Sequence, residues 1–436
     1  MDIKSLRKTG FKELVDFNKA RDDYLARCKP IEEHEFVDLI NARNRVISEP
    51  LTANLPIPNF SKSAMDGYAV KAEDTFKATV ENPREVKLID SISIGEYKDL
   101  SLEKGEAIKI ATGATLPKGA DAVIKIEDTE LVEPDKIVSI YVPLVPGKNV
   151  IKKGEDYKEG QEVLKKGHQI TAQDLGVLAN LGYKKIKVVR VPRITIFATG
   201  NELVELNEIE GGTADRIKSE NLPPAKVINS NRFLIQPLVE HAGATVVHAG
   251  LLRDDESVIR NAMDEALENS DMIITTGGTS VGEKDMLPVV LGKYYEIIHH
   301  GIAMKPGSAT LIGIGEGKPI LCLSGFPVAA QVAMLSFGVP AIKTLLGANI
   351  LDPRPVIKAK LHDAVPVKGF GVMRFLRVRL EPDSSDKDAL PWAKPVKLSG
   401  SSVQRTMIES DGIVELTESI EGYEKGTIVT VRLHPN

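Results

Sequence analysis

Cysteine is scarce in this chain of 436 residues, which contains only Cys28 and Cys322. Two cysteines so far apart exclude a disulfide framework and a structural zinc site of clustered thiols, and they fit a reducing cytosol. Cys322 lies in an apolar run, where a buried free thiol is the expected role. The chain also lacks an apolar signal-peptide core near Met1 and any run approaching about 18 apolar residues. We therefore expect a cytoplasmic protein that does not contact a membrane.

An excess of one charge is also absent. Lys and Arg number 56 against 61 Asp and Glu, which gives a formal net charge of −5, and the charges are interspersed. A protein that binds nucleic acid would show Lys and Arg clustered on one element, so no such partner is expected. The hydrophobic content of 42% is typical of a globular protein. At roughly 150 residues per domain, the length predicts about three domains.

The N-terminal half changes its pattern twice. Residues 11–28 and Glu33–Ile47 carry apolar side chains at a largely helical spacing, which predicts two helices. From about Leu51 to Pro146, short β-branched runs alternate with Gly and Pro and predict an all-β module. Thr171–Asp174 is typical of the start of a short helix, which Gly182 would end. The β module is therefore predicted to be inserted in a helical and mixed region formed by both flanks.

The C-terminal half begins with alternating strands and helices between Arg193 and about Gly347. The predicted strands are Ile194–Ala198, Ala244–His248, Met272–Thr276 and Ile320–Leu323, and a long helix is predicted from Pro327 to Leu346. Such alternation predicts a largely parallel sheet covered on both faces, with ligands at the carboxyl ends of its strands. After Pro353, apolar and polar residues alternate in two segments, which predicts a small C-terminal sandwich or barrel.

Paired glycines follow one of these predicted strands. Gly277 and Gly278 come directly after Met272–Thr276, and Asp285 stands a few residues further on. Glycines at a strand end leave backbone N–H groups free to point at an anion. A carboxylate beyond them suits Mg²⁺. The segment predicts a site for a phosphate-bearing ligand with a metal, and the alternative is a glycine-rich turn whose Asp caps the next helix.

Four further residues with reactive side chains stand in predicted loops, and each has a structural alternative. Asp66 precedes a glycine in a turn dipeptide, whose alternative role is structural. Thr112 follows a strand in a turn of small residues, where it either meets an oxyanion or belongs to a plain turn. Glu202 is either a ligand or a helix N-terminal charge. Lys305 is followed by Pro306 and Gly307, and a rigidly held ammonium suits phosphate or another oxyanion.

These segments, taken in order, resemble the motifs of the molybdopterin molybdenumtransferase family, which includes the MoeA proteins and the E domain of gephyrin. The resemblance covers nearly the whole chain, and several separate motifs in the right order form a specific signal. The motifs are Ser63–Ala69, Ala111–Ala114, Ala198–Leu203, Ser230–Arg232, Gly277–Asp285 and Lys305–Gly307.

The resemblance implies a multidomain fold of α/β and β parts. An elongated linker and dimerisation domain comprises residues 1–50 and 154–190, and an inserted β domain comprises 51–153. An α/β three-layer domain, similar to the molybdopterin adenylyltransferases, comprises 191–350, and a C-terminal β-barrel comprises 351–436. The resemblance also implies a homodimer whose cleft forms between the α/β domain of one subunit and the inserted domain of the other.

The implied reaction inserts molybdate, or tungstate, into adenylylated molybdopterin with Mg²⁺-dependent release of AMP. The upstream partner would be a protein of the molybdopterin adenylyltransferase type. The matching positions imply roles for particular residues: catalysis by Asp66, Thr112, Asp285 and Lys305, metal binding by Glu202 and Asp285, and binding of the pterin substrate by Gly277, Gly278, Ser280, Asn229 and Ser401.

Three positions depart from the family pattern. Asn229 stands where many relatives carry Asp, and Ser308 is close to where some carry a second lysine. Ser324–Pro327 reads Ser-Gly-Phe-Pro in place of the commoner Pro-Gly-Asn-Pro. Two other functions stay open: the preceding adenylyltransferase, which needs only the α/β domain, and a binding scaffold that has lost catalysis.

Overall fold

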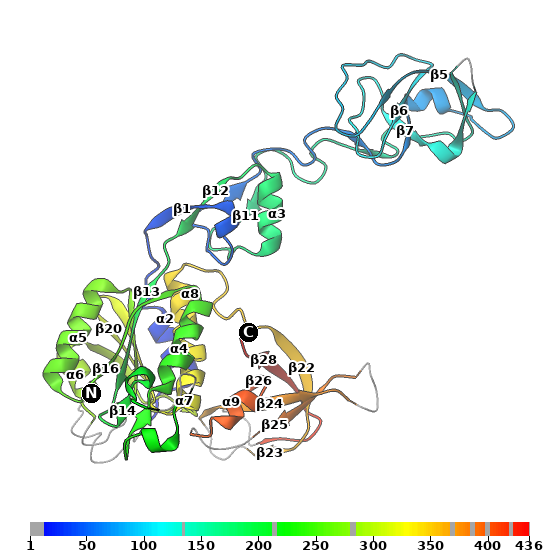
Figure 1. Ribbon diagram of the computed structural model, residues 1–436. Helices are drawn as coiled ribbons and strands as arrows, with labels where there is room; N and C mark the ends of the chain where they lie inside the picture. The colour runs from blue at the N-terminus through cyan, green and yellow to red at the C-terminus, as the bar shows by residue number, and fades with distance from the viewer. Residues whose placement is uncertain are drawn as a thin grey trace.

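The protein is elongated and has four parts. The computed structural model describes residues 13–132, 136–211, 216–279, 285–366, 371–383, 389–396, 402–417 and 422–435. Figure 1 shows an α/β unit and a β-barrel beside each other at one end, and an inserted β unit at the other end. A narrow linker joins the two ends. This arrangement confirms the predicted multidomain fold class.

The α/β unit is built on a six-stranded sheet in the order β16-β13-β17-β21-β20-β18. Neighbouring strands among the first four are parallel, whereas β20 and β18 run antiparallel to their neighbours. Because the carboxyl ends of parallel strands meet at one edge, the loops after β13, β17 and β21 lie close together. The bounds are β13 Arg193–Thr199, β16 Thr245–Leu252, β17 Met272–Thr276, β18 Glu296–His300, β20 Leu311–Gly315 and β21 Lys318–Leu323.

Helices cover both faces of this sheet, as predicted (Figure 1). One face packs against α5 and α6, and the other against α4, α7 and α8. The N-terminal helix α2 joins the second group, since the Phe17 ring contacts those of Phe337 and Phe375 at centroid distances of 5.5 and 5.4 Å. The bounds are α2 Phe17–Leu25, α4 Ser230–His241, α5 Glu256–Asn269, α6 Leu287–Tyr294, α7 Pro327–Ala333 and α8 Val339–Leu345.

The helix predicted from Pro327 is continuous through a π-helical turn at Met334–Gly338. By length and composition alone, the segment Pro327–Leu345 is apolar enough to cross a membrane. However, 89% of its apolar window is buried inside the protein, which is the pattern of a core helix. Cys322, on the adjacent strand β21, is a fully buried free thiol, as predicted.

The C-terminal sheet closes into a barrel because β24 pairs with both β25 and β26. The short strand β19, Met304–Lys305, comes from the α/β unit and pairs in parallel with the start of β24. The loop that carries Lys305 is therefore a hydrogen-bonded part of the barrel sheet. The barrel strands are β22 Val356–Leu361, β24 Met373–Glu381, β25 Trp392–Pro395, β26 Gly412–Leu416 and β28 Ile428–Leu433, and the short helix α9 spans Arg405–Glu409.

The inserted unit is a six-stranded sheet in the order β7-β4-β6-β5-β9-β8, which confirms the predicted β module. Apolar clusters lie on both of its faces. Gly67 begins β4, where a Cβ atom would lie 1.8 Å from the Ile124 carbonyl oxygen, so only glycine permits this strand spacing. The bounds are β4 Gly67–Val70, β5 Arg84–Ile92, β6 Glu106–Ile110, β7 Ala122–Lys125, β8 Thr129–Val132 and β9 Ile137–Ile140.

The linker consists of two chain segments that run antiparallel along each other. Three short ladders hold them together, and the predicted helix α3 packs beside them. Thr171 and Asp174 form a capping box at the start of α3, as predicted. The paired strands are β1 His34–Asp38 with β12 Lys185–Val189, β2 Leu51–Thr52 with β11 Glu162–Leu164, and β3 Lys62–Ser63 with β10 Val150–Ile151, and α3 spans Ala172–Asn180.

The helix predicted for Glu33–Ile47 is wrong. This segment forms β1 followed by a 3₁₀ turn at Leu39–Asn41. Two of the apolar side chains face solvent, since Phe36 is 67% and Ile40 is 81% exposed, whereas Val46 and Ile47 at the end of the segment are buried. The backbone of β1 pairs with β12 over five positions, and this long-range pairing overrides the local helical spacing.

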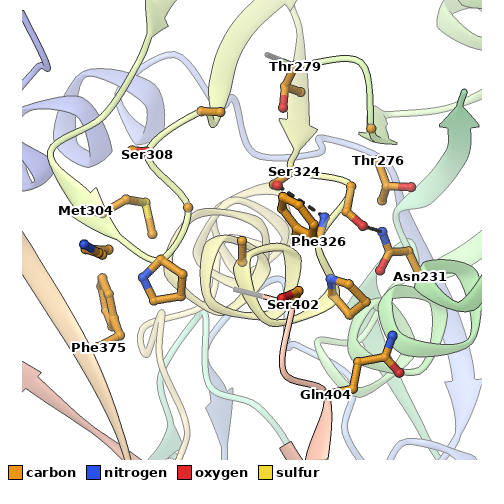
Figure 2. Close-up of a pocket in the computed structure, with 18 of the residues that line it drawn as sticks. Asn231, Thr276, Thr279, Met304, Ser308, Ser324, Phe326, Phe375, Ser402 and Gln404 are labelled. Carbon is orange, nitrogen blue, oxygen red and sulfur yellow. Dashed lines mark hydrogen bonds between the residues drawn. The ribbon is translucent and has the colours of Figure 1, made fainter. Parts of the chain in front are cut away.

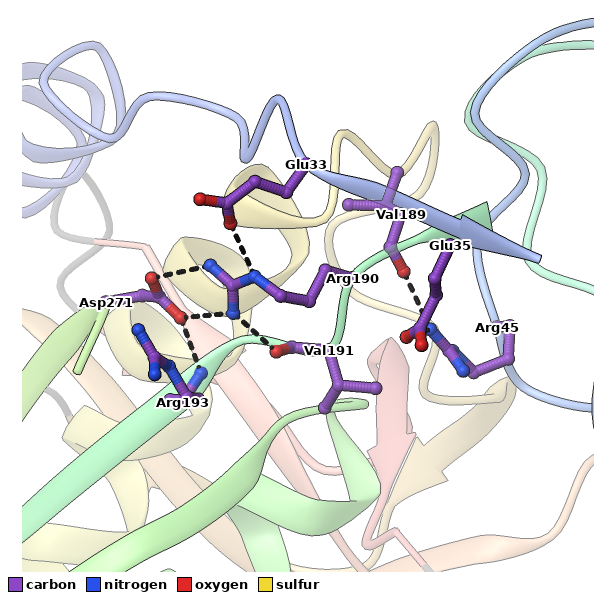
Figure 3. A network of polar contacts seen from close by, with 8 residues as sticks. All are labelled: Glu33, Glu35, Arg45, Val189, Arg190, Val191, Arg193 and Asp271. Atoms are coloured by element: carbon purple, nitrogen blue, oxygen red, sulfur yellow. Dashed lines mark hydrogen bonds and ion pairs between the residues drawn. The ribbon is translucent and has the colours of Figure 1, made fainter. Parts of the chain in front are cut away.

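Charged side chains fasten the linker to the α/β unit (Figure 3). The Arg190 guanidinium donates two hydrogen bonds of 2.9 Å to the Asp271 carboxylate and a third to Glu33. The backbone N–H of Arg193 also donates to Asp271, at 2.7 Å. Burial raises the pKa of Asp271, but its bonds to Arg190 and Arg193 outweigh this effect and hold the pKa below its usual value.

A buried lysine forms a second contact at this junction. Lys343 on α8 is fully buried, and its Nζ donates to Oε1 of Gln169 in the linker at 2.9 Å. Gln169 in turn donates to the Asn44 carbonyl at 3.0 Å. Burial lowers the pKa of Lys343 to about 8. The linker therefore meets the α/β unit through specific polar contacts.

Candidate functional site

A cavity of about 930 Å³ lies between the carboxyl edge of the α/β sheet and the barrel. Residues from the ends of β13, β17 and β21, from the loop after β19 and from β24 form its wall (Figure 2). The sequence motifs from the α/β region therefore meet in one place. The predicted site residues that line it are Glu202, Asn229, Gly277, Gly278, Asp285 and Lys305.

The two residues after β17 must be glycines, because close contacts and the backbone conformation leave no place for a side chain. Gly277 has φ +87° and Gly278 has φ +62°, both in the left-handed region that favours glycine. A Cβ on Gly277 would lie 2.4 Å from the carbonyl oxygen of Thr199, at the end of β13. The interpretation that both N–H groups are free for an anion is wrong for Gly277, because its N–H donates to the Leu323 carbonyl at 3.0 Å.

Glu202 follows β13 and presents an exposed carboxylate to the cavity. Its placement depends on Gly200, which has φ +144° and where a Cβ would lie 2.6 Å from Oε1 of Glu202. Asp254, in the loop after β16, is a nearby carboxylate that the sequence did not indicate. Burial first, and then the charge of Glu202, raise the pKa of Asp254.

The contacts of Asn229 show why an amide side chain suits this position. It is 4% exposed, and its Nδ2 donates to Oε1 of the buried Glu205 at 2.8 Å. An aspartate here would place two carboxylates against each other, which is unfavourable in a buried site. Asn229 therefore stabilises Glu205, whose other oxygen lies 3.6 Å from Arg232.

Two carboxylates of this cavity fit the requirements of a hydrated Mg²⁺ ion. Glu202 and Asp285 both line it, and Mg²⁺ binds through one or two carboxylates while it retains waters and phosphate oxygens. Within the described ranges, no group of three or more His, Cys, Asp or Glu side chains is arranged to hold a metal. The protein side chains would thus form part of the ligand shell, and the substrate would complete it.

Cationic side chains also line the cavity. Lys305 is exposed in the cavity, and β19 places it directly beside Arg374 of β24. Pro306, Gly307 and Ser308 continue this loop along the cavity. The loop thus gives Lys305 a fixed backbone, as the sequence pattern predicted.

Arg377 is a cation that sequence reasoning missed. It lines the cavity and is only 3% exposed, and burial lowers the pKa of its guanidinium. Its Nε has no hydrogen-bond partner, and no carboxylate in the described part of the chain pairs with it. A buried guanidinium without a counter-ion favours binding of an anionic group.

Asp66 and Thr112 lie elsewhere in the molecule. The Thr112 N–H donates to Oδ1 of Asp66 at 2.8 Å, and both residues are exposed beside the paired ends of β4 and β6. The inserted unit stands at the far end of the linker from the cavity (Figure 1). A single chain therefore brings Asp66 and Thr112 together but does not bring them to the cavity. Ser280 and Ser401 lie outside the described residues.

Three family models match the chain in order. The MoeA N-terminal region (domain I and II) matches residues 15–182, and the MoeA C-terminal region (domain IV) matches residues 358–433. Between them, residues 195–344 match a probable molybdopterin binding domain. The first model covers the linker and its inserted unit, and the second covers the α/β unit that carries most of the cavity. The third model covers the barrel.

Similar proteins extend over nearly the same length. A Methanocaldococcus jannaschii protein is 36% identical over 433 residues, which cover 99% of this chain and 98% of its own. The molybdopterin molybdenumtransferase of Bacillus subtilis is 34% identical over 408 residues, 92% of this chain and 90% of its own. A crystal structure of the molybdopterin biosynthesis moeA protein from Pyrococcus horikoshii OT3 matches with a TM-score of 0.82 at 30% identity, covering 97% of this chain and 100% of that one. The chain belongs to the MoeA family.

Proposed function

We propose that this protein is a molybdopterin molybdenumtransferase that acts in molybdenum cofactor biosynthesis. The observation that carries the proposal is one cavity whose lining includes both carboxylates, Glu202 and Asp285, and cations, Lys305 and Arg377. Such a cavity suits a substrate that combines a phosphoanhydride, a metal ion and a tetrahedral oxyanion. Relatives that share about a third of their residues over most of the chain carry this name.

In the proposed reaction, adenylylated molybdopterin reacts with molybdate, or tungstate, and AMP is released. Glu202 and Asp285 would hold Mg²⁺, which when bound would stabilise the charge that develops on the cleaved phosphoanhydride. Lys305 would contact the oxyanion or a phosphate as a point charge. The Arg377 guanidinium would supply a second cation from the barrel side, in a setting where burial strengthens its attraction for an anion.

The glycine loop would orient the substrate. Gly277 and Gly278 allow this loop to pack directly against Thr199 at the end of β13, which fixes the edge of the cavity against which the substrate would lie. Asn229 would act through Glu205 and thereby maintain the wall of the cavity. These residues position the substrate, whereas the charged groups act on the reacting atoms.

We further propose a cytoplasmic homodimer in which the exposed pair of Asp66 and Thr112 reaches the cavity of the partner subunit. The pair is already joined by a hydrogen bond, and its exposure leaves it open to a second chain. The upstream partner would be a protein that adenylylates molybdopterin. Neither nucleic acid nor a membrane is required.

The experiment that tests the function measures AMP release from adenylylated molybdopterin with molybdate and Mg²⁺. We expect Mg²⁺-dependent release in the wild-type protein, and a loss of about 100-fold or more in Asp285→Ala and Lys305→Ala, because each removes a charge from the reacting centre. Wild-type rates in both variants would contradict the assigned roles. Consumption of ATP with formation of the adenylylated pterin would instead support the adenylyltransferase.

A further inference from the structure

Phe326 is an exposed aromatic ring in the wall of the cavity. It is 55% exposed and lines the cavity, in the loop between β21 and α7 (Figure 2). No aromatic ring in the described part of the chain packs against it. An exposed aromatic side chain in the wall of a binding cavity is available to contact a ligand.

The backbone that carries this ring is held in place. The N–H of Phe326 donates to Oγ of Ser324 at 3.3 Å, and Asn231 donates from Nδ2 to the Gly325 carbonyl at 2.9 Å (Figure 2). A Cβ on Gly325 would lie 3.5 Å from the Gly277 Cα, so this loop packs against the glycine loop. Pro327 then begins α7. The ring is therefore presented by a fixed loop.

The position of this loop favours one class of ligand group. Phe326 lies beside the glycine loop, while the cations stand on the wall formed by β19 and β24. If Lys305 and Arg377 hold anionic groups of a substrate, Phe326 is available to contact an uncharged part of it. Planar heteroaromatic rings stack on aromatic side chains, and each such contact contributes about five- to a hundredfold in affinity.

We propose that Phe326 is a specificity-determining residue that stacks against a planar heteroaromatic ring of the substrate. This inference rests on the proposed function, in which the substrate carries two such rings, adenine and pterin. Both rings have the same stacking chemistry, and separate affinity measurements distinguish them. The family motif more commonly has Asn here, so this contact would be a departure of this chain from that motif.

The test measures the affinities of AMP alone and of an unsubstituted pterin alone by calorimetric titration. Phe326→Leu keeps an apolar side chain but removes the ring, and Phe326→Tyr keeps the ring. We expect Phe326→Leu to lower the affinity for one of the two probes at least about fivefold. The affinities of Phe326→Tyr should stay within about twofold of those of the wild type. The control is Phe233→Leu on α4, where the ring is similarly exposed at 58% but does not line the cavity.

The outcomes distinguish this inference from the function itself. A weaker affinity for AMP assigns the ring to adenine, and a weaker affinity for the pterin assigns it to that ring. In turnover, the KM for adenylylated molybdopterin should rise while the KM for molybdate stays constant. Unchanged affinities in Phe326→Leu, with a wild type that binds the probes and releases AMP, would overturn the stacking role alone. A wild type that neither binds the probes nor releases AMP would overturn the proposed function.

Discussion

Gly200 shows how a missing side chain positions a functional group. Its φ is +144°, and a Cβ added there would lie only 2.6 Å from Oε1 of Glu202, so an alanine would force the flexible Glu202 carboxylate to move. We expect Gly200→Ala to displace the Glu202 carboxylate and to reduce AMP release about 100-fold, because small misplacements of catalytic groups have effects of that size. Saturating Mg²⁺ should restore part of the activity.

The matched control for this change is Gly160→Ala in the linker. Gly160 also has a left-handed backbone, with φ +81°, but no atom lies within 4 Å of the added Cβ. The Gly160→Ala variant should therefore be less stable than the wild type but equally active. Equal losses of activity in both variants would show that backbone strain, and not the displaced carboxylate, is responsible.

Replacement of Arg377 by an apolar residue should preserve or raise the stability of the protein but weaken the binding of molybdate. Its guanidinium is almost fully buried without a counter-ion in the described part of the chain, so Arg377→Met replaces an unfavourable buried charge with an apolar side chain. We expect the free energy of unfolding to stay equal or rise by about 1 kcal/mol. The KM for molybdate should rise more than about tenfold, because a charge-assisted contact is lost.

Denaturant unfolding and steady-state kinetics on the same preparations check this prediction. Arg379→Met on the same strand is the control, since Arg379 is exposed. A variant that loses stability while keeping the wild-type KM for molybdate would contradict an anion-binding role for Arg377 and indicate a structural one.

The junction between linker and α/β unit should depend on pH through Asp271. Its folded-state pKa is lower than its usual value of about 3.9, so its contribution to stability is present above that pH and is lost as the pH falls through the folded-state value. We expect Asp271→Asn to lower the free energy of unfolding by about 2 kcal/mol at pH 7. The difference from wild type should shrink below about pH 4.

Urea denaturation at several pH values measures this difference. Asp38→Asn is a suitable control, because Asp38 lies 3.6 Å from Lys185 in a pair whose side chains are both more than half exposed. Exposed ion pairs contribute little, so this variant should remain close to wild type at every pH. A constant difference for Asp271→Asn across the pH range would show that its carboxylate charge is not the cause.

Elements whose signals are local could be predicted from the sequence. The capping box of α3, the strand β17 and the long buried helix from Pro327 all agree with the structure, because caps, β-branched runs and apolar periodicity act within a few residues. The segment Glu33–Ile47 could not be predicted in this way. Its strand depends on pairing with residues about 150 positions away, which no local pattern reveals.

The site was predicted where its residues follow strand ends and missed where they come from a strand interior. Glu202 and Asp285 stand in loops at the sheet edge, where ligands of such sheets bind, and Lys305 ends the short strand β19 beside them in the cavity wall. Arg377 alternates with apolar residues along β24, which predicts a solvent-facing side chain. Its face instead packs toward the α/β unit together with Phe375. The domain boundaries and the roles of the site residues stay predictions.

The whole molecule places two groups of predicted site residues at its opposite ends. If the active cleft forms between subunits, inactive chains should complement each other. We expect an equal mixture of Asp66→Ala and Lys305→Ala chains, after subunit exchange, to recover about a quarter of wild-type activity, because half of the dimers would contain one intact cleft of two.

The control mixture combines Lys305→Ala with Asp285→Ala. Both residues line the same cavity, so no mixed dimer contains an intact cleft and no activity should return. AMP release by the mixtures, compared with the separate variants, gives the measurement. A mixture of Asp66→Ala and Lys305→Ala that stays inactive despite demonstrated subunit exchange would contradict a shared cleft.

The pairing of β19 with β24 couples the position of the barrel to the geometry of the cavity. Because the backbone of Lys305 completes the barrel sheet, the barrel can change its surface loops freely but cannot shift against the α/β unit without moving this lysine. A shortened chain that ends before Val356 would leave Met304 and Lys305 as an unpaired edge. An α/β unit without the barrel would therefore have to hold this loop by other means.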